Sequence, residues 1–220
     1  MKPTLSTIVI VALAITGCGS SDTESVSGDR VPSGTYAIDQ SHTYVTFSYL
    51  HQGLSYPLLR ATNVNGELNF DSDDITRSEV GIAIAADSIR TNLDHFDKEL
   101  ASRKFFNAEK YPYISFLSES YVETGDKEGI LRGQVTIRGV TEALELAVTL
   151  NNALVHPVLD IPVIGFSATG SLTRSDFGLD RFVPVISDTV VFEIETEFLL
   201  RSDESSASAA AIAREASIER

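Results

Sequence analysis

From Ser33 to Leu200 the chain alternates apolar and polar residues, and this period-two pattern constrains its fold more than any other feature. Successive side chains of a strand point to opposite faces of a sheet, so each alternating run predicts a strand with one apolar face. Turn residues separate the runs, at 71–74, 125–126, 138–141 and 151–152. About eight strands with short connections predict an all-β domain, whose antiparallel sheet buries one side on itself as a barrel or as a sandwich.

Residues 92–110 interrupt this alternation. Leu93, Phe96, Leu100 and then Phe105 recur near helical spacing, with charged residues between them, and this pattern is typical of an amphipathic helix. A long helical excursion in an all-β domain often covers one mouth as a lid or a plug. We therefore expect a helical insertion that closes one end of the domain.

The first 17 residues carry the features of an export signal. Lys2 supplies a basic start, residues 5–16 are almost wholly apolar or small, and the run ends at Cys18, the only cysteine of the chain. The run is too short to span a bilayer, which needs about 20 apolar residues. Ile15-Thr16-Gly17-Cys18 resembles the lipobox of bacterial lipoproteins, in which acyl chains such as palmitate are attached to the cysteine. The alternative is an ordinary signal peptide with an unrelated cysteine.

These features divide the chain into four segments. We expect a lipoprotein signal peptide over 1–17, a flexible tether rich in Ser, Gly, Asp and Glu over 18–32, the β-domain over 33–200, and a low-complexity tail over 201–220. Acyl chains on Cys18 would anchor the protein in the cell envelope, where it would face the periplasm. By resemblance to known sorting rules, Gly19 after the cysteine favours the outer membrane over the inner one.

The charge of the chain excludes some partners. Its formal net charge is −14, so nucleic acid and anionic lipid heads would be repelled. Membrane attachment should therefore depend on the acyl chains alone.

The sequence carries no recognisable catalytic or metal-binding motif. His42, His51, His95 and His156 lack the close spacing of metal ligands, and 165–169 lacks the second glycine of a nucleophile elbow. With Cys18 consumed by acylation, thiol catalysis is excluded as well. We expect a protein that is not an enzyme, with no metal and no cofactor.

The interior of the β-domain is the remaining candidate site. An eight-stranded barrel can be filled by its own side chains or can hold one small ligand, and the apolar faces mix large aromatic residues with small ones. The candidate interior residues are Phe47, Tyr49, Phe70, Ile84, Phe116, Val135, Phe166, Ala168 and Phe192. A packed core and a ligand cavity are both compatible with this set.

A series of short motifs resembles the YceI-like family. The series is Tyr36-Ala-Ile-Asp39-x-x-His42-x-x-Val45-x-Phe47, His51-x-Gly53, Asp87-Ser88-Ile89-x-Thr91, Glu99-Leu100-x-Ser102-x-x-Phe105-Phe106-Asn107, Tyr111-Pro112-x-Ile114-x-Phe116, Gly133-x-Val135-Thr136-Ile137-Arg138-Gly139-Val140-Thr141, Gly165-Phe166-x-Ala168 and Arg174-Ser175-Asp176-Phe177-Gly178-Leu179. Each motif alone is weak, but their order and spacing across residues 33–200 make the resemblance specific.

The resemblance implies a lipocalin-like antiparallel β-barrel that holds a long isoprenoid lipid in its interior, either a polyprenyl phosphate or an isoprenoid quinone, for transport or storage. It implies no catalysis. Arg90, Arg103 and Arg174 lie in or near the motifs and are the candidate head-group contacts, since a guanidinium can donate two hydrogen bonds to one phosphate. The alternative is that these arginines form loop ion pairs with nearby aspartates.

Two other functions stay open at this point. A filled barrel would be a non-catalytic, stress-related or protein-interaction module of the cell envelope. An enzyme acting on a lipid or a pyrophosphate would use the arginines together with Asp176. The sequence also leaves dimerisation undecided.

Overall fold

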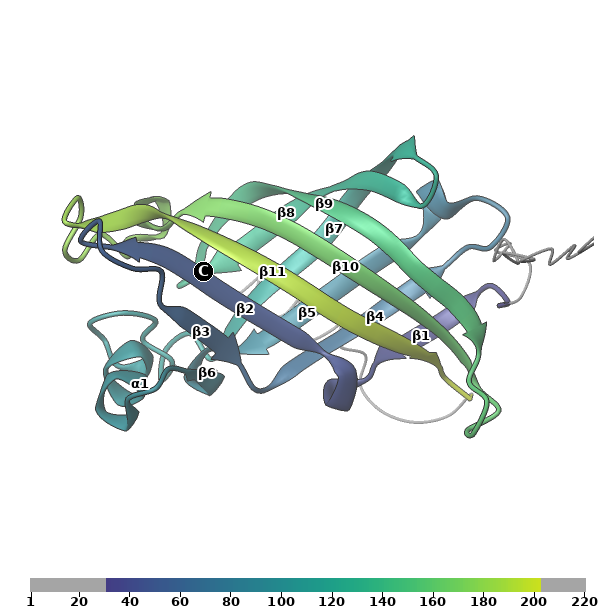
Figure 1. Cartoon of the computed structure of the whole chain (residues 1–220), viewed down its shortest axis with the longest axis horizontal. Coiled ribbons are helices and arrows are strands. Elements are labelled where there is room, and N and C mark those ends of the chain that lie inside the picture. Colours follow the sequence, from purple (N-terminus) through teal and green to yellow (C-terminus); the bar gives the residue numbers. More distant parts are fainter. Residues whose placement is uncertain (1–30, 203–220) are drawn as a thin grey trace, which may run out of the picture.

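The alternating runs fold into strands that hydrogen-bond side by side around a closed ring (Figure 1). The computed structural model describes residues 31–202. Its strands are β1 (Gly34–Ile38), β2 (Tyr44–His51), β3 (Leu58–Ala61), β4 (Val64–Phe70), β5 (Glu79–Ala85), β6 (Ile89–Arg90), β7 (Tyr113–Gly125), β8 (Glu128–Ile137), β9 (Val140–Val155), β10 (Pro162–Thr173) and β11 (Ile186–Leu200). The helices are α1 (Asp94–Ala101) and the short 3₁₀ turns η2 (Gln40–His42), η3 (Ile75–Arg77), η4 (Ala86–Ser88) and η5 (Arg174–Phe177).

Eight strands close the barrel. They pair in the order β1–β4–β5–β7–β8–β9–β10–β11, and β11 pairs with β1 to complete the ring. Every ladder is antiparallel, and at the closure Tyr36 lies opposite Leu68 on one side and Leu200 on the other. The prediction of an eight-stranded antiparallel barrel is confirmed, and the sandwich is excluded because β1 and β11 are paired rather than left as edges.

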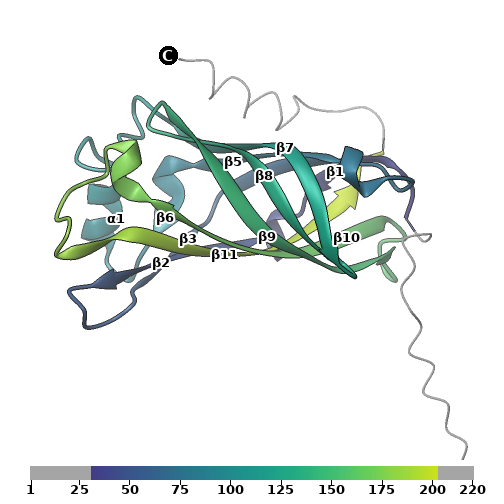
Figure 2. The ribbon, with the colours of Figure 1, turned by 90° about the horizontal axis from the view of Figure 1, so that it is seen from above.

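The first three strands of the ring each consist of two parts. β2 continues β1 beyond η2, β3 precedes β4, and β6 follows β5 beyond η4. The shorter segments β2, β3 and β6 pair with one another and with β11, in the order β11–β2–β3–β6. They extend the barrel wall at the end where α1 lies (Figure 2).

Apolar side chains fill the barrel at the end opposite α1. This packed cluster consists of Val31, Tyr36, Leu68, Phe70, Ala153, Ile164 and Phe198. Tyr36 and Ile164 are fully buried, and the Tyr36 ring meets the Phe70 ring edge-on with centroids 6.0 Å apart. We call this half of the barrel the filled end.

The domain is slightly longer at both ends than the sequence pattern predicts. Val31 packs into the filled end, and the Tyr36 hydroxyl donates to the Pro32 carbonyl at 2.6 Å. Burial raises the pKa of Tyr36 to about 12, so this hydroxyl keeps its proton at neutral pH. At the other terminus, Arg201 Nη1 lies 2.8 Å from Glu67 Oε2. Val31, Pro32 and Arg201 therefore belong to the barrel. The sequence pattern misses them because an alternation of apolar and polar residues cannot be recognised in a segment of only one or two residues. The signal peptide, Cys18, most of the tether and all but the start of the tail lie outside the described residues.

The insertion at 92–110 is only partly helical, so the predicted helix is too long. α1 ends at Ala101, and Ser102 caps it by donating from its backbone N–H and its hydroxyl to the Glu99 carbonyl, at 3.1 and 2.6 Å. The chain then turns back, because the Phe106 N–H bonds to the Leu100 carbonyl and Asn107 adopts a positive φ of 51°. Within residues 31–202, none of the helices has the length and apolar character needed to cross a bilayer.

Candidate functional site

The half of the barrel nearest α1 is hollow. It holds a cavity of about 650 Å³ whose walls come from the strands, from the α1 insertion and from the connection between β10 and β11. Six of the nine predicted interior residues line it: Phe47, Tyr49, Ile84, Phe116, Val135 and Phe192. We call this half the mouth end.

Two phenylalanines of the cavity wall lie over glycines of the neighbouring strands. Phe116 and Phe192 line the cavity, and each lies across a glycine of the neighbouring strand. A Cβ on Gly133 would lie 2.7 Å from the Phe116 ring, and one on Gly170 would lie 2.6 Å from the Phe192 ring. The two glycines therefore leave room for the rings against the cavity wall.

Three predicted interior residues do not line the cavity. Phe70 and Phe166 pack at the filled end, where the Phe166 ring meets Phe198 edge-on. Ala168 is buried, and its cross-strand neighbours are Val148 of β9 and Ile194 of β11. The alternation identifies the inward face of a strand, but it does not say at which height along the barrel each inward residue sits.

The insertion supplies an apolar lid. Phe96, Leu100, Phe105 and Phe106 line the cavity, and the Phe96 and Phe105 rings meet edge-on with centroids 5.9 Å apart. The expectation that the insertion covers one mouth agrees with this placement.

A side-chain clamp joins the lid to the barrel wall. Asp97 of α1 accepts hydrogen bonds from the backbone N–H and the hydroxyl of Thr91, at 2.7 and 2.6 Å. The hydrogen bond from the Thr91 side chain is the main reason that the pKa of Asp97 lies below its ordinary value. The ionised carboxylate therefore holds the start of the helix in place.

The connection between β10 and β11 forms the opposite side of the mouth, and Arg174 organises it. This arginine is only 8% exposed, and its guanidinium donates to four backbone carbonyls of the connection. Nε donates to Ser187 at 2.9 Å, Nη1 to Arg181 at 3.0 Å and to Leu179, and Nη2 to Ile186 at 3.1 Å. Sequence reasoning missed Leu179, Phe182 and Ile186 as cavity residues, because the segment shows neither helical nor strand periodicity.

The permanent charges in the cavity wall have one sign. Arg174 and Arg181 line the cavity, and no carboxylate of the described residues does. Among residues 31–202, no carboxylate forms an ion pair with Arg174. Burial raises the pKa of the nearby Tyr49, and the positive charge of Arg174 offsets part of this shift. A buried cation without a counter-ion is costly, so this wall favours an anionic group.

The other two predicted head-group arginines lie outside the cavity. Arg90 donates from Nη1 to the Asp87 carbonyl at 2.6 Å. Arg103 pairs with Glu109 at 3.6 Å, and both side chains are more than four-fifths exposed. Of the three, the structure brings only Arg174 to the cavity wall.

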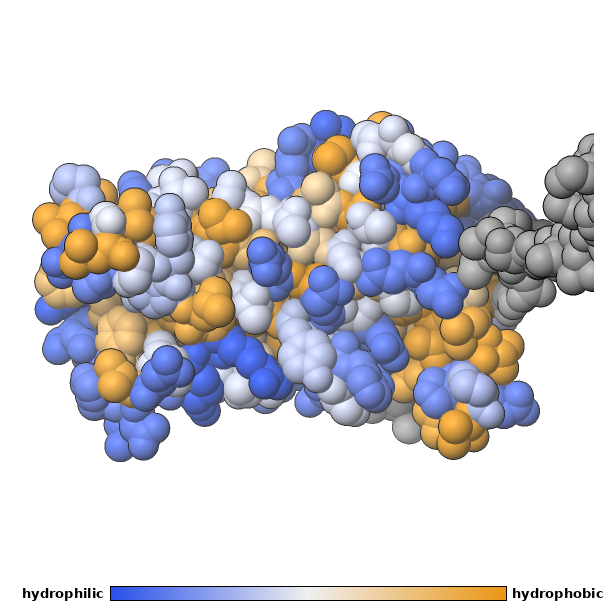
Figure 3. Space-filling model, in the orientation of Figure 1, coloured by the Kyte–Doolittle hydropathy of each residue, from blue (hydrophilic) through white to orange (hydrophobic). Residues whose placement is uncertain are grey.

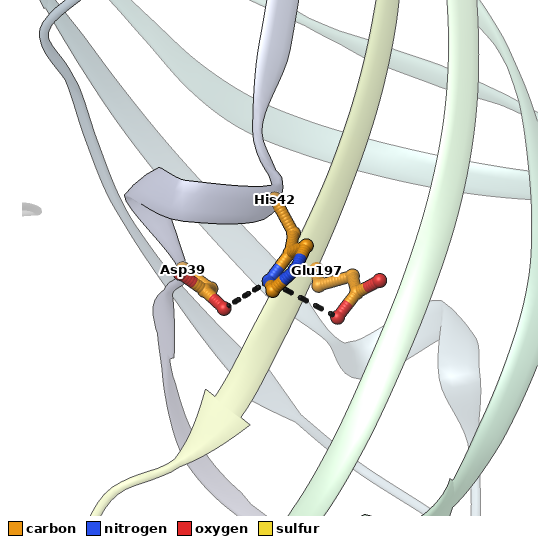
Figure 4. Close-up of side chains that lie close together, drawn as sticks. All are labelled: Asp39, His42 and Glu197. Carbon is orange, nitrogen blue, oxygen red and sulfur yellow. Dashed lines mark hydrogen bonds and ion pairs between the residues drawn. The ribbon is translucent and has the colours of Figure 1, made fainter.

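Asp39, His42 and Glu197 form a second polar cluster, outside the cavity at the break between β1 and β2 (Figure 4). Asp39 accepts from the backbone N–H and the hydroxyl of Ser41 and lies 2.7 Å from His42 Nδ1. These hydrogen bonds lower the pKa of Asp39 against the opposing effect of its burial, and the carboxylate raises the pKa of His42. Three potential metal ligands lie within 4.8 Å of one another, but the Asp39 carboxylate already has hydrogen-bond partners within the turn. The cluster accounts for the shape of η2.

The fold and the cavity together define a class of protein: an antiparallel barrel with one packed half, and one hollow apolar half beneath a helical lid. The family model for the YceI-like domain matches residues 36–198. The chain therefore belongs to the YceI-like domain family.

Relatives and solved structures agree with this assignment. A UPF0312 protein of Pseudomonas putida (strain F1) is 30% identical over 177 residues, which cover 80% of this chain and 91% of the relative. The crystal structure of Burkholderia cenocepacia BcnA superposes with a TM-score of 0.66 at 17% identity, covering 73% of this chain and 98% of that one. A polyisoprenoid-binding domain from Saccharophagus degradans superposes with a TM-score of 0.58 at 14% identity, covering 76% and 98%. At these identities the structural matches show a shared fold.

Proposed function

We propose that this YceI-like protein binds an isoprenoid lipid with an anionic head group in the mouth-end cavity and does not transform it. One observation carries the proposal: the cavity wall is mostly apolar, and its charged residues are two arginines of the β10–β11 connection, Arg174 and Arg181. The tail would lie against the apolar side chains of the wall, which include Phe116 and Phe192, and the head group would lie beside Arg174. The Saccharophagus degradans domain, which is described as polyisoprenoid-binding, supports this ligand class.

The cavity of about 650 Å³ is open at its mouth, so a long prenyl tail can lie partly inside it. At about 0.3 kcal/mol per buried non-hydrogen atom, a tail with about 20 buried atoms contributes about 6 kcal/mol, which corresponds to a Kd of tens of micromolar. A charged head group beside Arg174 would add to this affinity. This reasoning favours a prenyl phosphate over a neutral quinone.

The location and the mode of action belong to the same proposal. We propose that acyl chains on Cys18 tether the barrel to a membrane of the cell envelope, facing the periplasm, where it carries or stores the lipid. The apolar run before Cys18 supports this location. The hollow mouth end counts against a completely filled barrel that acts only as an interaction module.

Mass spectrometry tests the proposal. Residues 18–220 with Cys18→Ser would be purified from a bacterium and compared before and after solvent extraction. We expect a discrete bound mass that partitions into organic solvent and fragments as a prenyl chain. A second measurement compares a soluble C20 prenyl phosphate with the matching alcohol, and we expect the phosphate to bind at least about tenfold more tightly. A chain that purifies without lipid and binds neither probe would refute the proposal.

A further inference from the structure

Six exposed apolar side chains surround the mouth of the cavity. We call Leu54, Tyr56, Leu58, Leu93, Phe182 and Val185 the rim patch. They come from the β2–β3 turn and the first residue of β3, from the N-cap of α1 and from the β10–β11 connection, which lie far apart in the sequence. Leu58, Leu93 and Phe182 also line the cavity, so the exposed apolar surface continues into it. Figure 3 shows hydrophobic surface at this end of the molecule, on the left of the view.

The charge of the mouth end differs from that of the rest of the barrel. The segments that form it are 52–60, 87–112, 138–142 and 174–188, and they contain equal numbers of basic and acidic residues. In the remainder of residues 31–202, the basic residues are Arg77, Lys127, Arg132 and Arg201, whereas acidic residues are several times more numerous. The acidic barrel would be repelled by a membrane surface, but its mouth end would not.

We propose that the rim patch docks on a lipid bilayer, so that the mouth of the cavity opens directly onto the membrane. Exposed Leu, Tyr and Phe side chains with neighbouring Lys and Arg are the composition of surfaces that sit at the membrane interface. Arg181 illustrates the pairing, since its guanidinium lies 4.6 Å from the centre of the Phe182 ring. An apolar ligand would then pass from bilayer to cavity without crossing water. This inference rests on the proposed function.

A matched pair of variants tests the docking. Leu54 and Val185 are 81% and 64% exposed and do not line the cavity, so Leu54→Ser/Val185→Ser leaves the binding site intact. The control, Val158→Ser/Leu159→Ser, removes one valine and one leucine that are 84% and 52% exposed in the β9–β10 connection, at the filled end. Both variants should fold normally, because surface substitutions rarely change stability by more than about 0.5 kcal/mol.

The assay is flotation with phosphatidylcholine vesicles, using residues 18–220 with Cys18→Ser. Neither acyl chains nor the apolar run at 5–16 can then contribute, and the whole described barrel is retained. We expect the rim variant to lower the partition coefficient by at least about tenfold, since a buried leucine alone is worth about that factor. The control variant should partition like the unmodified chain. All three proteins are also titrated with the C20 prenyl phosphate in solution, where no bilayer is present.

The outcomes separate this inference from the proposed function. Loss of vesicle binding by the rim variant alone, with prenyl phosphate binding retained, supports both. The same loss in a protein that does not bind prenyl phosphate supports the docking and refutes the ligand. If all three proteins float equally, or if none of them floats, the docking inference is wrong even if prenyl phosphate binds. Sedimentation velocity tests for a dimer. If the unmodified chain is a dimer that does not float with vesicles, and the rim substitutions dissociate it, then the rim contacts a second copy and the inference is wrong.

Discussion

Replacing Arg174 by methionine tests whether this side chain holds the β10–β11 connection in place. The substitution keeps the long apolar stem but removes the donors to the carbonyls of Leu179, Arg181, Ile186 and Ser187. At about 1 kcal/mol per net hydrogen bond, the four bonds contribute about 4 kcal/mol. Relief from burying a charge offsets part of this loss. We therefore expect the free energy of unfolding to fall by about 2–4 kcal/mol.

Urea denaturation followed by tyrosine fluorescence measures this loss, since the chain contains no tryptophan. The midpoint should fall while the m-value stays unchanged, because the surface exposed on unfolding is nearly the same. Arg174→Lys keeps the charge but cannot reach all four carbonyls, so its loss should be intermediate. A loss below about 1 kcal/mol for Arg174→Met would refute the reasoning, since the carbonyls would then have found other partners at little cost.

Three further predictions concern the cavity, the lid and the C-terminal boundary. Val135→Phe should weaken prenyl phosphate binding at least about tenfold by occupying the cavity, whereas Val122→Phe, on the exposed face of β7, should not; equal Kd values for both would contradict the placement of the ligand. The pKa of Asp97 is lowered, so its hydrogen bonds to Thr91 should persist below the ordinary aspartate pKa and break only as the pH falls through the lowered value. Amide hydrogen exchange at Thr91 measures this loss, and Asp97→Asn should abolish its pH dependence. A chain that ends before Arg201 should melt at a lower temperature than one that retains it, because the partly buried Glu67 loses this partner; equal melting temperatures would place Arg201 outside the folded domain.

The sequence predicts the walls of the barrel better than its contents. Strand alternation places Phe47, Phe116 and Phe192 inside, and it also places Phe70 and Phe166 inside, although the first three line a cavity and the last two fill a core. The difference depends on packing between neighbouring strands, such as a ring lying over a glycine, and no single strand pattern contains that information.

The mouth was harder to predict for a different reason. A basic residue in a motif suggests an anion partner, but Arg90 and Arg103 find partners in the nearby chain and lie outside the cavity. Arg174 reaches the cavity wall because the β10–β11 connection wraps around its guanidinium. That wrapping uses backbone carbonyls, which every residue carries, so side-chain identities do not reveal it.

The described chain enters and leaves the barrel at the filled end, opposite the mouth (Figure 2). If Cys18 is acylated, the tether residues 19–30 can span at most about 40 Å between the acylated cysteine and the barrel. β11, with 15 residues and a tilt of about 40°, spans a similar distance along the barrel axis, roughly 40 Å. A barrel that stands upright on its anchor then points its mouth away from the anchoring membrane. To bring the mouth to that membrane, the barrel must turn over and the tether must be almost fully extended. The length of the tether, rather than the chemistry of the cavity, would therefore decide whether the mouth reaches the anchoring membrane or only a membrane that faces it.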